Sequence, residues 1–263
     1  GERIIAERHR LYLLPPPTQP IKPPDQKQTP THTFWLGEYW ETDLVQTQIV
    51  LNEKQFDWLI TDHYSLDFRW ENEMRKFASK IMVIDDLADR RHDCDLLLDQ
   101  TLGRNEGEYQ HWVAGGCILL TGSKYALLRP EFLELREYSL KRRKNSKMKH
   151  LLICMGGIDQ SNSTGQILDA LQTSLLPSYC RITVVMGENA PWIDSVCEQV
   201  KKMSWPTEIK VNVADMAQLM ADSDLAIGAA GSTSWERCCL GLPTLMVILE
   251  KNQKDIGQAL ERE

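Results

Sequence analysis

The segment from Asp222 to Gly241 combines small residues, hydroxyl groups and one carboxylate in an order that suits nucleotide binding. A short apolar run, Leu225–Ile227, leads into Gly228-Ala229-Ala230-Gly231-Ser232, and a helical pattern follows from Thr233. Small residues between a strand and a helix let backbone N–H groups approach a phosphate. Glu236 lies one turn further on, where its carboxylate can accept hydrogen bonds from ribose hydroxyls. Thr233 and Glu236 equally fit a Thr-x-x-Glu capping box, which needs no ligand, so both interpretations stay open.

A second glycine turn follows the apolar run 150–155. Gly156 and Gly157 come directly after it, with Asp159 close behind and Asn162 at the predicted start of a helix. Ligands of open α/β sheets bind at the carboxyl ends of strands, so two such turns can flank one nucleotide. Asn162 also fits a helix N-cap, a function that is compatible with ligand binding.

Polar residues follow two further predicted strands. Asp62-His63-Tyr64 ends the first, where the tyrosine hydroxyl can position a sugar or a water and the histidine can move protons. The alternative is an Asp–His or Asp–backbone pair that shapes the loop. Asn252 and Gln253 follow the strand 244–248, where they can bind an uncharged sugar or cap the helix expected near 255–262.

The densest group of carboxylates lies between Asp85 and Asp95. Carboxylates of this kind bind Mg²⁺, but Arg90, Arg91 and His92 stand among them, so ion pairing explains the run without a metal. No His and Cys spacing fits a zinc site. We predict neither a metal site nor a cofactor.

Apolar runs alternate with helix-length segments along most of the chain, which indicates parallel strands covered on both faces. One further strand is expected at Arg10–Leu14, before a run of prolines. The basic segment 141–149 marks the main break in composition. We predict an N-terminal α/β domain over 1–128, a linker helix over 129–149 and a C-terminal α/β domain over 150–263. A cleft between the two domains would hold the ligand.

The bulk composition is that of a water-soluble globular protein, with 42% hydrophobic and 25% charged residues among 263. A net charge of −7 argues against nucleic acid or an anionic membrane as the main partner. Seven scattered cysteines are typical of a reducing compartment. No apolar run approaches the roughly 20 residues of a membrane-spanning helix. We expect a monomeric cytoplasmic protein.

Seven segments together carry a family resemblance in their order and spacing. They are Asp62–Asp67, Val83–Arg90, Cys94–Gln100, Tyr125–Phe132, Met155–Asn162, Ala229–Cys238 and Glu250–Gln253. In these segments the chain resembles the UDP-2,4-diacetamido-2,4,6-trideoxy-β-L-altropyranose hydrolases of pseudaminic acid biosynthesis. The resemblance extends from about Trp35 to Gln253 and is far more specific than any single segment.

This resemblance implies a GT-B-like fold, in which two doubly wound parallel-sheet domains face a cleft. It also implies metal-independent hydrolysis of the sugar–UDP bond with inversion, after which UDP stays on the second domain. Tyr64 and Asn252 would be catalytic, on the sugar and water side. Asn162 and Glu236 would hold the substrate, Glu236 through the uridine ribose. The remaining substrate-binding residues would be Gly156, Gly157, Asp159, Gly231, Ser232, Thr233, Ser234 and Gln253, with the turn 231–234 taking the diphosphate.

One feature of the family is absent from this sequence. The family begins with a Gly-x-Gly-His-x-x-Arg loop whose histidine is regarded as the general base, whereas His9 and His32 lack that glycine context. We therefore expect an incomplete N-terminal domain, shorter by about fifty residues, which corresponds to one strand–helix–strand unit with its loops. His63 is the nearest substitute for the base. Two alternatives are an inactive UDP-sugar-binding homologue and a GT-B glycosyltransferase that uses a UDP-sugar donor.

Overall fold

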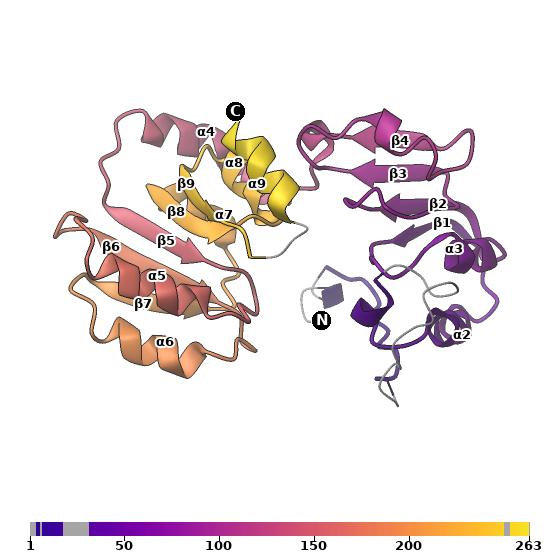
Figure 1. Ribbon diagram of the computed structural model, residues 1–263, viewed down its shortest axis with the longest axis horizontal. Coiled ribbons are helices and arrows are strands. Elements are labelled where there is room, and N and C mark those ends of the chain that lie inside the picture. The colour runs from indigo at the N-terminus through magenta and orange to yellow at the C-terminus, as the bar shows by residue number, and fades with distance from the viewer. Residues whose placement is uncertain (1–3, 6, 18–31, 250–252, 263) are drawn as a thin grey trace. The chain divides into compact units, whose positions relative to one another are not determined.

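The computed structural model describes residues 4–5, 7–17, 32–249 and 253–262, and Figure 1 shows their secondary structure. The chain divides into two compact units, Gly1–Tyr125 and Ala126–Glu263. Each unit contains one parallel β-sheet with its own hydrophobic core.

The sheet of the first unit has four parallel strands in the order β1-β2-β3-β4. They are β1 (Phe56–Thr61), β2 (Ala78–Ile84), β3 (Leu96–Asp99) and β4 (Ile118–Thr121). The helical elements are η1 (Thr33–Trp35), α2 (Trp40–Leu51), α3 (Phe68–Met74), η2 (Glu106–Glu108) and η3 (Ser123–Tyr125). Strand order follows chain order, so the carboxyl ends of all four strands lie along one edge of this sheet.

The core of the first unit lies between its sheet and the helices α2 and α3. Leu44, Trp70 and Met74 of the helices pack in one buried cluster with Ile81 and Leu97 of the strands. The β1 side chains at alternate positions 56, 58 and 60 are exposed instead. The expectation that strands are covered on both faces is therefore wrong for β1, because it is an outer strand whose helices pack on one face only.

The strand expected at Arg10–Leu14 is also not formed. These residues have no regular secondary structure, and Pro15, Pro16 and Pro17 follow them. A β-strand is stabilised by hydrogen bonds to a neighbouring strand, and the proline nitrogens cannot donate any. An apolar pattern alone does not supply that neighbour.

The second unit contains a five-stranded parallel sheet in the order β7-β6-β5-β8-β9. Its strands are β5 (His150–Cys154), β6 (Arg181–Met186), β7 (Thr207–Val211), β8 (Leu225–Ala229) and β9 (Thr244–Val247). Its helices are α4 (Pro130–Arg143), α5 (Ser163–Leu171), α6 (Ile193–Val200), α7 (Met216–Asp222), α8 (Thr233–Cys239) and α9 (Lys254–Glu261). The alternation of strand and helix predicted for this half of the chain is confirmed.

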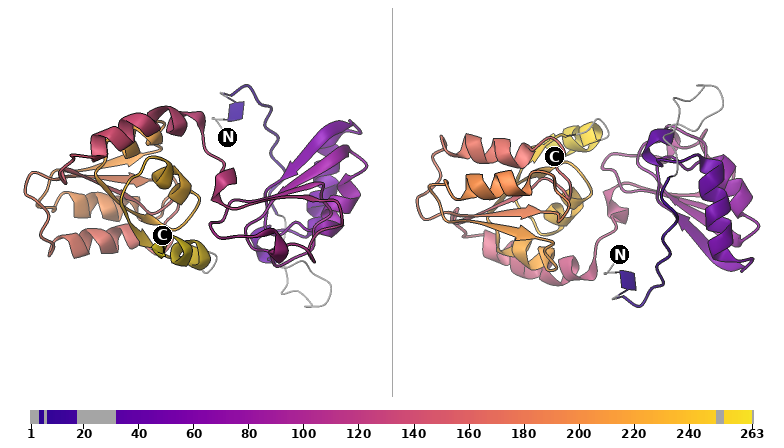
Figure 2. Two further views of the ribbon diagram at one scale, coloured as in Figure 1. Left: turned by 90° about the horizontal axis from the view of Figure 1, so that it is seen from above. Right: turned by 90° about the horizontal axis from the view of Figure 1, so that it is seen from below.

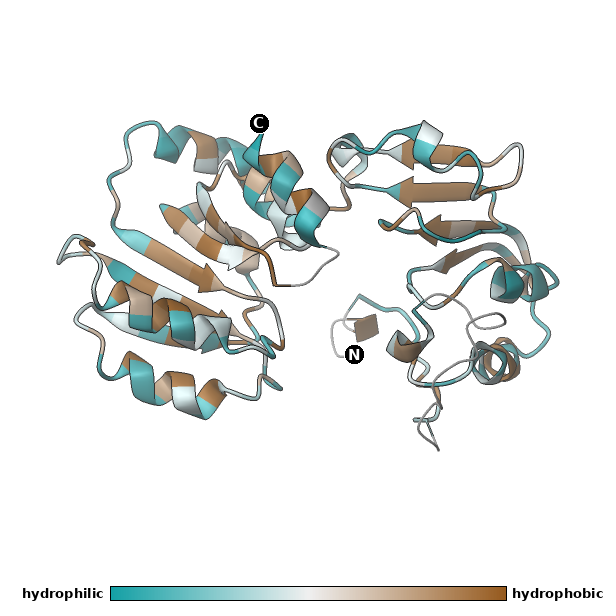
Figure 3. Cartoon of the chain, in the orientation of Figure 1, coloured by the Kyte–Doolittle hydropathy of each residue, from teal (hydrophilic) through white to brown (hydrophobic). Residues whose placement is uncertain are grey.

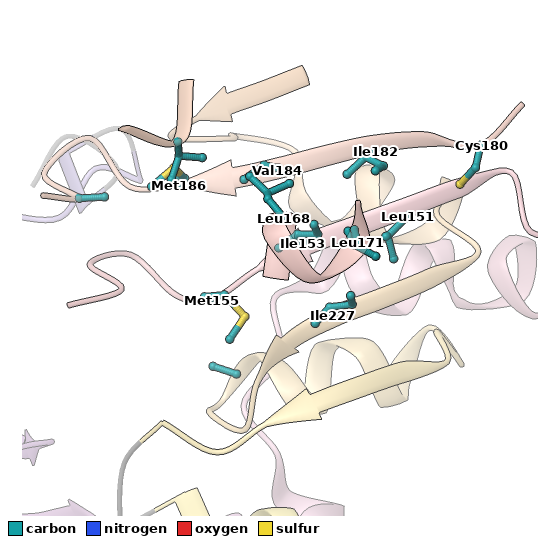
Figure 4. Packing of buried hydrophobic residues seen from close by; sticks show 13 residues of the cluster. Leu151, Ile153, Met155, Leu168, Leu171, Cys180, Ile182, Val184, Met186 and Ile227 are labelled. Atoms are coloured by element: carbon teal, nitrogen blue, oxygen red, sulfur yellow. The ribbon is translucent and has the colours of Figure 1, made fainter. Parts of the chain in front are cut away.

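Helices cover both faces of this second sheet, as Figure 2 shows. On one face Leu151 and Ile153 of β5 pack with Leu168 of α5 and Val196 of α6, and Figure 4 shows much of this cluster. On the other face Leu152 packs in a cluster that α4, α7 and α8 supply. Strands buried on both faces carry nearly continuous apolar runs, which Figure 3 shows in brown.

The helix α4, predicted as a linker, packs within the second unit. It contacts α7 and α8, and Phe132 is fully buried against them. Arg143 adds hydrogen bonds from its guanidinium to the carbonyls of Met220 and Ser223. These bonds connect α4 to the carboxyl end of α7, where helix carbonyls have no partner within the helix.

Candidate functional site

Both glycine turns lie where the strand order of the second sheet reverses. From β5 the chain proceeds to β6 and β7 on one side, and β8 and β9 are added on the other side. Cys154 at the end of β5 pairs in register with Gly228 near the end of β8. The turns after these two strands therefore begin side by side, at the type of topological switch point where open α/β sheets bind ligands.

A buried arginine stabilises the turn between β8 and α8. The guanidinium of Arg237 donates to the carbonyl oxygen of Ala229 at 2.7 Å and to Oγ of Ser234 at 3.0 Å. A Cβ atom at Gly228 would collide with this guanidinium, so the glycine provides space for it. Burial lowers the pKa of Arg237. The turn thus contains a positive charge that is shielded from water.

The capping-box interpretation of Thr233 and Glu236 is wrong. Ser232, not Thr233, is the N-cap residue of α8, and its side chain makes no capping hydrogen bond. Thr233 is the first helical residue, and its hydroxyl accepts a hydrogen bond from Arg237 at 3.4 Å. The Glu236 carboxylate is therefore not used to cap the helix.

Glu236 instead faces Arg129, which belongs to none of the predicted sites. Nη2 of Arg129 lies 3.5 Å from Oε1 of Glu236, while Nη1 lies 2.9 Å from Oε1 of Glu131. Burial raises the pKa of Glu236, and the Arg129 charge opposes that shift. A half-buried carboxylate next to an arginine can bind hydroxyl and phosphate groups together. The two residues are 107 positions apart, so no local pattern pairs them.

The residues of the turn after β5 mainly hold the backbone of the turn and of the start of α5 in place. Gly156 has a φ of 94°, a conformation that favours glycine, and the space next to it is open. Asp159 is buried, and its two carboxylate oxygens accept N–H bonds from Ser163 and Thr164, each at 2.8 Å. Asn162 is the N-cap of α5 and accepts from the N–H of Gly165. Asp159 and Asn162 thus organise the start of α5, and their contact with substrate stays a prediction.

Of the two residues predicted after β9, Gln253 is described by the structure. Gln253 is the N-cap of α9, and its Oε1 accepts a hydrogen bond from the N–H of Leu249 at 3.0 Å. The proposed catalytic residue Asn252 lies outside the described residues.

Tyr64, the other predicted catalytic residue, lies at the carboxyl edge of the first sheet. Its ring contacts Trp35 at a centroid distance of 4.8 Å and meets His32 edge-on at 6.4 Å. Its hydroxyl hydrogen-bonds the carboxylate of Asp86, directly after β2. Burial, with smaller effects from Asp85 and Asp99, raises the pKa of Asp86 to about 6.

His63 bonds to the backbone of its own loop. Its Nδ1 accepts a hydrogen bond from the N–H of Ser65 at 3.1 Å, and burial lowers the pKa of the imidazole.

The acidic segment between Asp85 and Asp95 forms ion pairs, as predicted. Arg90 pairs with Asp85 at 2.6 Å, and Arg75 pairs with Asp93 and Asp95 at 2.8 and 3.0 Å. No group of three or more metal-binding side chains occurs among the residues described by the structure. Within the same residues, no helix has the length and apolar character needed to cross a bilayer.

Comparison with known proteins finds similarity within the second unit and along most of the chain. Residues 159–261 match the glycosyltransferase family 28 C-terminal domain. The uncharacterized protein MJ1062 of Methanocaldococcus jannaschii is 27% identical over 203 residues, which cover 76% of this chain and 42% of that protein. The UDP-2,4-diacetamido-2,4,6-trideoxy-β-L-altropyranose hydrolase of Campylobacter jejuni is 27% identical over 214 residues, which cover 81% of this chain and 74% of the hydrolase.

The fold is similar to that of a solved structure. The crystal structure of MurG from Acinetobacter baumannii superposes with a TM-score of 0.58 at 12% identity, covering 99% of this chain and 72% of MurG. The predicted GT-B-like class, with two parallel-sheet α/β domains, is confirmed. The chain spans less than half of its relative MJ1062.

Proposed function

We propose that this chain binds and processes a UDP-linked sugar, and that the reaction is hydrolysis of UDP-2,4-diacetamido-2,4,6-trideoxy-β-L-altropyranose to the free sugar and UDP. The observation that carries the proposal is the position of Glu236 and both glycine turns at the reversal of strand order. The similarity to the Campylobacter hydrolase, which extends over 81% of this chain, supports the choice of substrate.

The second unit would hold the nucleotide. Glu236 would accept hydrogen bonds from the ribose hydroxyls, for which a half-buried carboxylate is well suited because bonds to a charged acceptor are strong. The turn Gly231–Ser234 and Asn162 would contact the diphosphate side. Arg129 and the buried Arg237 supply positive charge next to this turn. A leaving diphosphate accumulates negative charge, which nearby cations stabilise in the transition state.

Tyr64 and Asn252 would act on the sugar and on water. The oxygen of water forms a bond to the anomeric carbon as the bond from that carbon to the UDP oxygen breaks. UDP leaves with the electron pair, and the water proton passes to a protein base. Attack opposite the leaving group inverts the anomeric centre, and no metal takes part in the proposed reaction.

Two measurements test this proposal. Calorimetry with UDP tests binding, and UDP release from the diacetamido-altropyranose nucleotide tests hydrolysis. Glu236→Gln is expected to weaken UDP binding by about 1.5–3 kcal/mol, or roughly 10- to 100-fold. Glu198→Gln, at an exposed glutamate of the same unit, is the matched control and should leave binding unchanged. Absence of UDP binding would contradict the proposal, and binding without turnover would favour the inactive homologue.

A glycosyltransferase is the second candidate, and the match of residues 159–261 to the glycosyltransferase family 28 domain favours it. In that case the sugar passes to a hydroxyl of an acceptor and not to water. Product analysis by NMR, with and without added acceptor sugars, separates the two reactions. Free sugar as the sole product in the presence of acceptors supports hydrolysis.

A further inference from the structure

Two cysteine thiols are in contact at the amino-terminal edge of the first sheet. Sγ of Cys94 lies 3.6 Å from Sγ of Cys117, although the residues are 23 positions apart. Cys94 precedes β3 in the chain and Cys117 precedes β4. Because the four strands are parallel, this edge is opposite to the one where Tyr64 and Asp86 follow their strands. The pair is therefore separate from the predicted site residues of this unit.

Strand pairing brings the two thiols together. Leu96 at the start of β3 pairs in register with Ile118 at the start of β4, and the N–H of Ile118 donates to the carbonyl oxygen of Asp95 at 2.9 Å. Cys94 is 3% exposed and belongs to the core of this unit, and Cys117 packs against the same core. A disulfide needs the two sulfur atoms to lie about 1.5 Å closer, which a small rotation of the side chains can supply.

The backbone before Cys117 leaves room for such a movement. Ala114, Gly115 and Gly116 are all exposed, and the space beside both glycines is open. This short segment can therefore adjust without disturbing the packed core.

The two thiols differ in access and in acidity. Cys94 is buried and Cys117 is half-buried, so a small molecule in solvent reaches Cys117 first. The S–H of Cys94 donates to the Cys117 sulfur, which lowers the pKa of Cys117 against the effect of burial. The same contact, together with burial, raises the pKa of Cys94. The thiolate is the nucleophile in thiol–disulfide exchange, so Cys117 is suited to attack and Cys94 to resolve the product.

The charges around the pair allow a thiolate to form. Asp93 and Asp95 precede and follow Cys94 in the chain. Both carboxylates form ion pairs with the guanidinium of Arg75, at 2.8 and 3.0 Å. These ion pairs reduce the repulsion that the carboxylates would exert on a negatively charged sulfur.

We propose that Cys94 and Cys117 are a redox-sensitive pair, which a small-molecule disulfide such as glutathione disulfide converts into an intramolecular disulfide. The Cys117 thiolate attacks one sulfur of the small molecule, whose S–S bond breaks, and one small thiol leaves with the electron pair. The sulfur of Cys94 then attacks the Cys117 sulfur of the mixed disulfide and displaces the second small thiol. Overall the two cysteines lose two electrons and two protons, which the two released thiols carry. An excess of free thiol reverses both steps.

Peptide mapping of the full chain tests the pair. The reduced protein is incubated with glutathione disulfide, the remaining thiols are blocked with N-ethylmaleimide, and the protein is digested with trypsin. Cys94 is the only cysteine of the tryptic peptide 92–104, and Cys117 is the only cysteine of the peptide 105–124. We expect a disulfide to join these two peptides in most chains of the folded protein. The same treatment in urea should instead distribute disulfides among the seven cysteines.

Single substitutions separate the attacking cysteine from the resolving one. Cys94→Ala should stop the reaction at a glutathione adduct on Cys117, whereas Cys117→Ala should leave the buried Cys94 unmodified. Cys197→Ala, at a half-buried cysteine of α6, is the matched control and should form the linked peptides as the wild type does. If a variant at either cysteine of the pair does not fold, as judged by circular dichroism, the wild-type peptide map decides alone.

The disulfide also has an expected effect on stability. It would close a loop that contains β3 and η2, which restricts the unfolded chain. In urea, the unfolded fraction of the first unit should fall by about 30-fold or more on oxidation, as is usual for a disulfide.

Two results would overturn the proposal. One is that the linked peptides are no more abundant after treatment of the folded chain than after treatment in urea. The other is that the first unit of the linked chain unfolds more readily than that of the reduced chain, because the bond then forms only in a distorted unit. Neither result bears on UDP binding or hydrolysis, so this inference and the proposed function are tested independently.

Discussion

Replacing the Asp86 carboxyl by an amide (Asp86→Asn) is expected to stabilise the first unit at neutral pH. This carboxyl follows β2 directly, and its Oδ1 is buried without a hydrogen-bond partner among the described residues. Burial is the main cause that raises its pKa from 3.8 to about 6, and the Tyr64 hydroxyl partly opposes the shift. Ionising Asp86 in the folded protein is therefore unfavourable.

The sign and size of the effect follow from proton linkage. Because the folded state binds this proton more tightly than the unfolded state, the stability contribution is complete below about pH 4. It is lost as the pH rises through about 6. At about 1.4 kcal/mol per pKa unit, the loss is at most about 3 kcal/mol. Partial contact with solvent reduces our expectation to about 2 kcal/mol. The Asp86→Asn variant keeps an acceptor for Tyr64 and should not show this loss.

Hydrogen exchange with mass spectrometry across a urea series measures the unfolding of each unit separately. The free energy of unfolding of Asp86→Asn should exceed that of the wild type by about 2 kcal/mol at pH 7.5, and the two should be nearly equal at pH 4. Asp57→Asn, at an exposed aspartate of β1, should have no effect at either pH. A difference that does not change with pH, or a less stable variant at pH 7.5, would refute this reasoning.

Four further substitutions test contacts within the units by urea unfolding. Tyr109→Phe removes the hydroxyl that lies 2.9 Å from each of two buried carboxylates, and should destabilise the first unit by about 2 kcal/mol. Arg237→Met leaves a backbone carbonyl without its donor, and should destabilise the second unit by about 2–3 kcal/mol. Asp159→Ala should cost about 1–2 kcal/mol because two N–H groups lose their acceptor, whereas Thr233→Ala should cost less than about 0.5 kcal/mol because no capping box exists. Equal effects of the last two substitutions would contradict the assignment of the caps.

Local patterns in the sequence predicted most of the elements, because the spacing of apolar residues in a segment reflects which of its faces is buried. The apolar runs at 81–84 and 150–154 form the interior strands β2 and β5. The pattern at Arg10–Leu14 failed because a strand also requires a neighbouring strand, which a local pattern does not specify. The helix limits were less accurate, since the helix expected near 255–262 spans Lys254–Glu261.

The candidate site was predictable only in part. Glycine turns after strands identified the two loops near Gly156 and Gly231, since position at a strand end is a local property. The capping box at Thr233 could not be excluded from sequence, because its residue types fit and only the backbone conformation decides it. Arg129 was missed because its partner, Glu236, is 107 positions away in the chain.

The sequence by itself determined the alternation of strands and helices, the two glycine turns, and the polar residues at strand ends. Side chains a few positions apart encode these features, because they determine which face of a segment is buried and which backbone conformation it prefers. Only the tertiary structure decided that β5 and β8 are neighbours, that Arg237 lies beneath the turn after β8, and that His32 pairs with Asp89. Such contacts arise when the chain folds back on itself, and their energies depend on distances that no local pattern specifies.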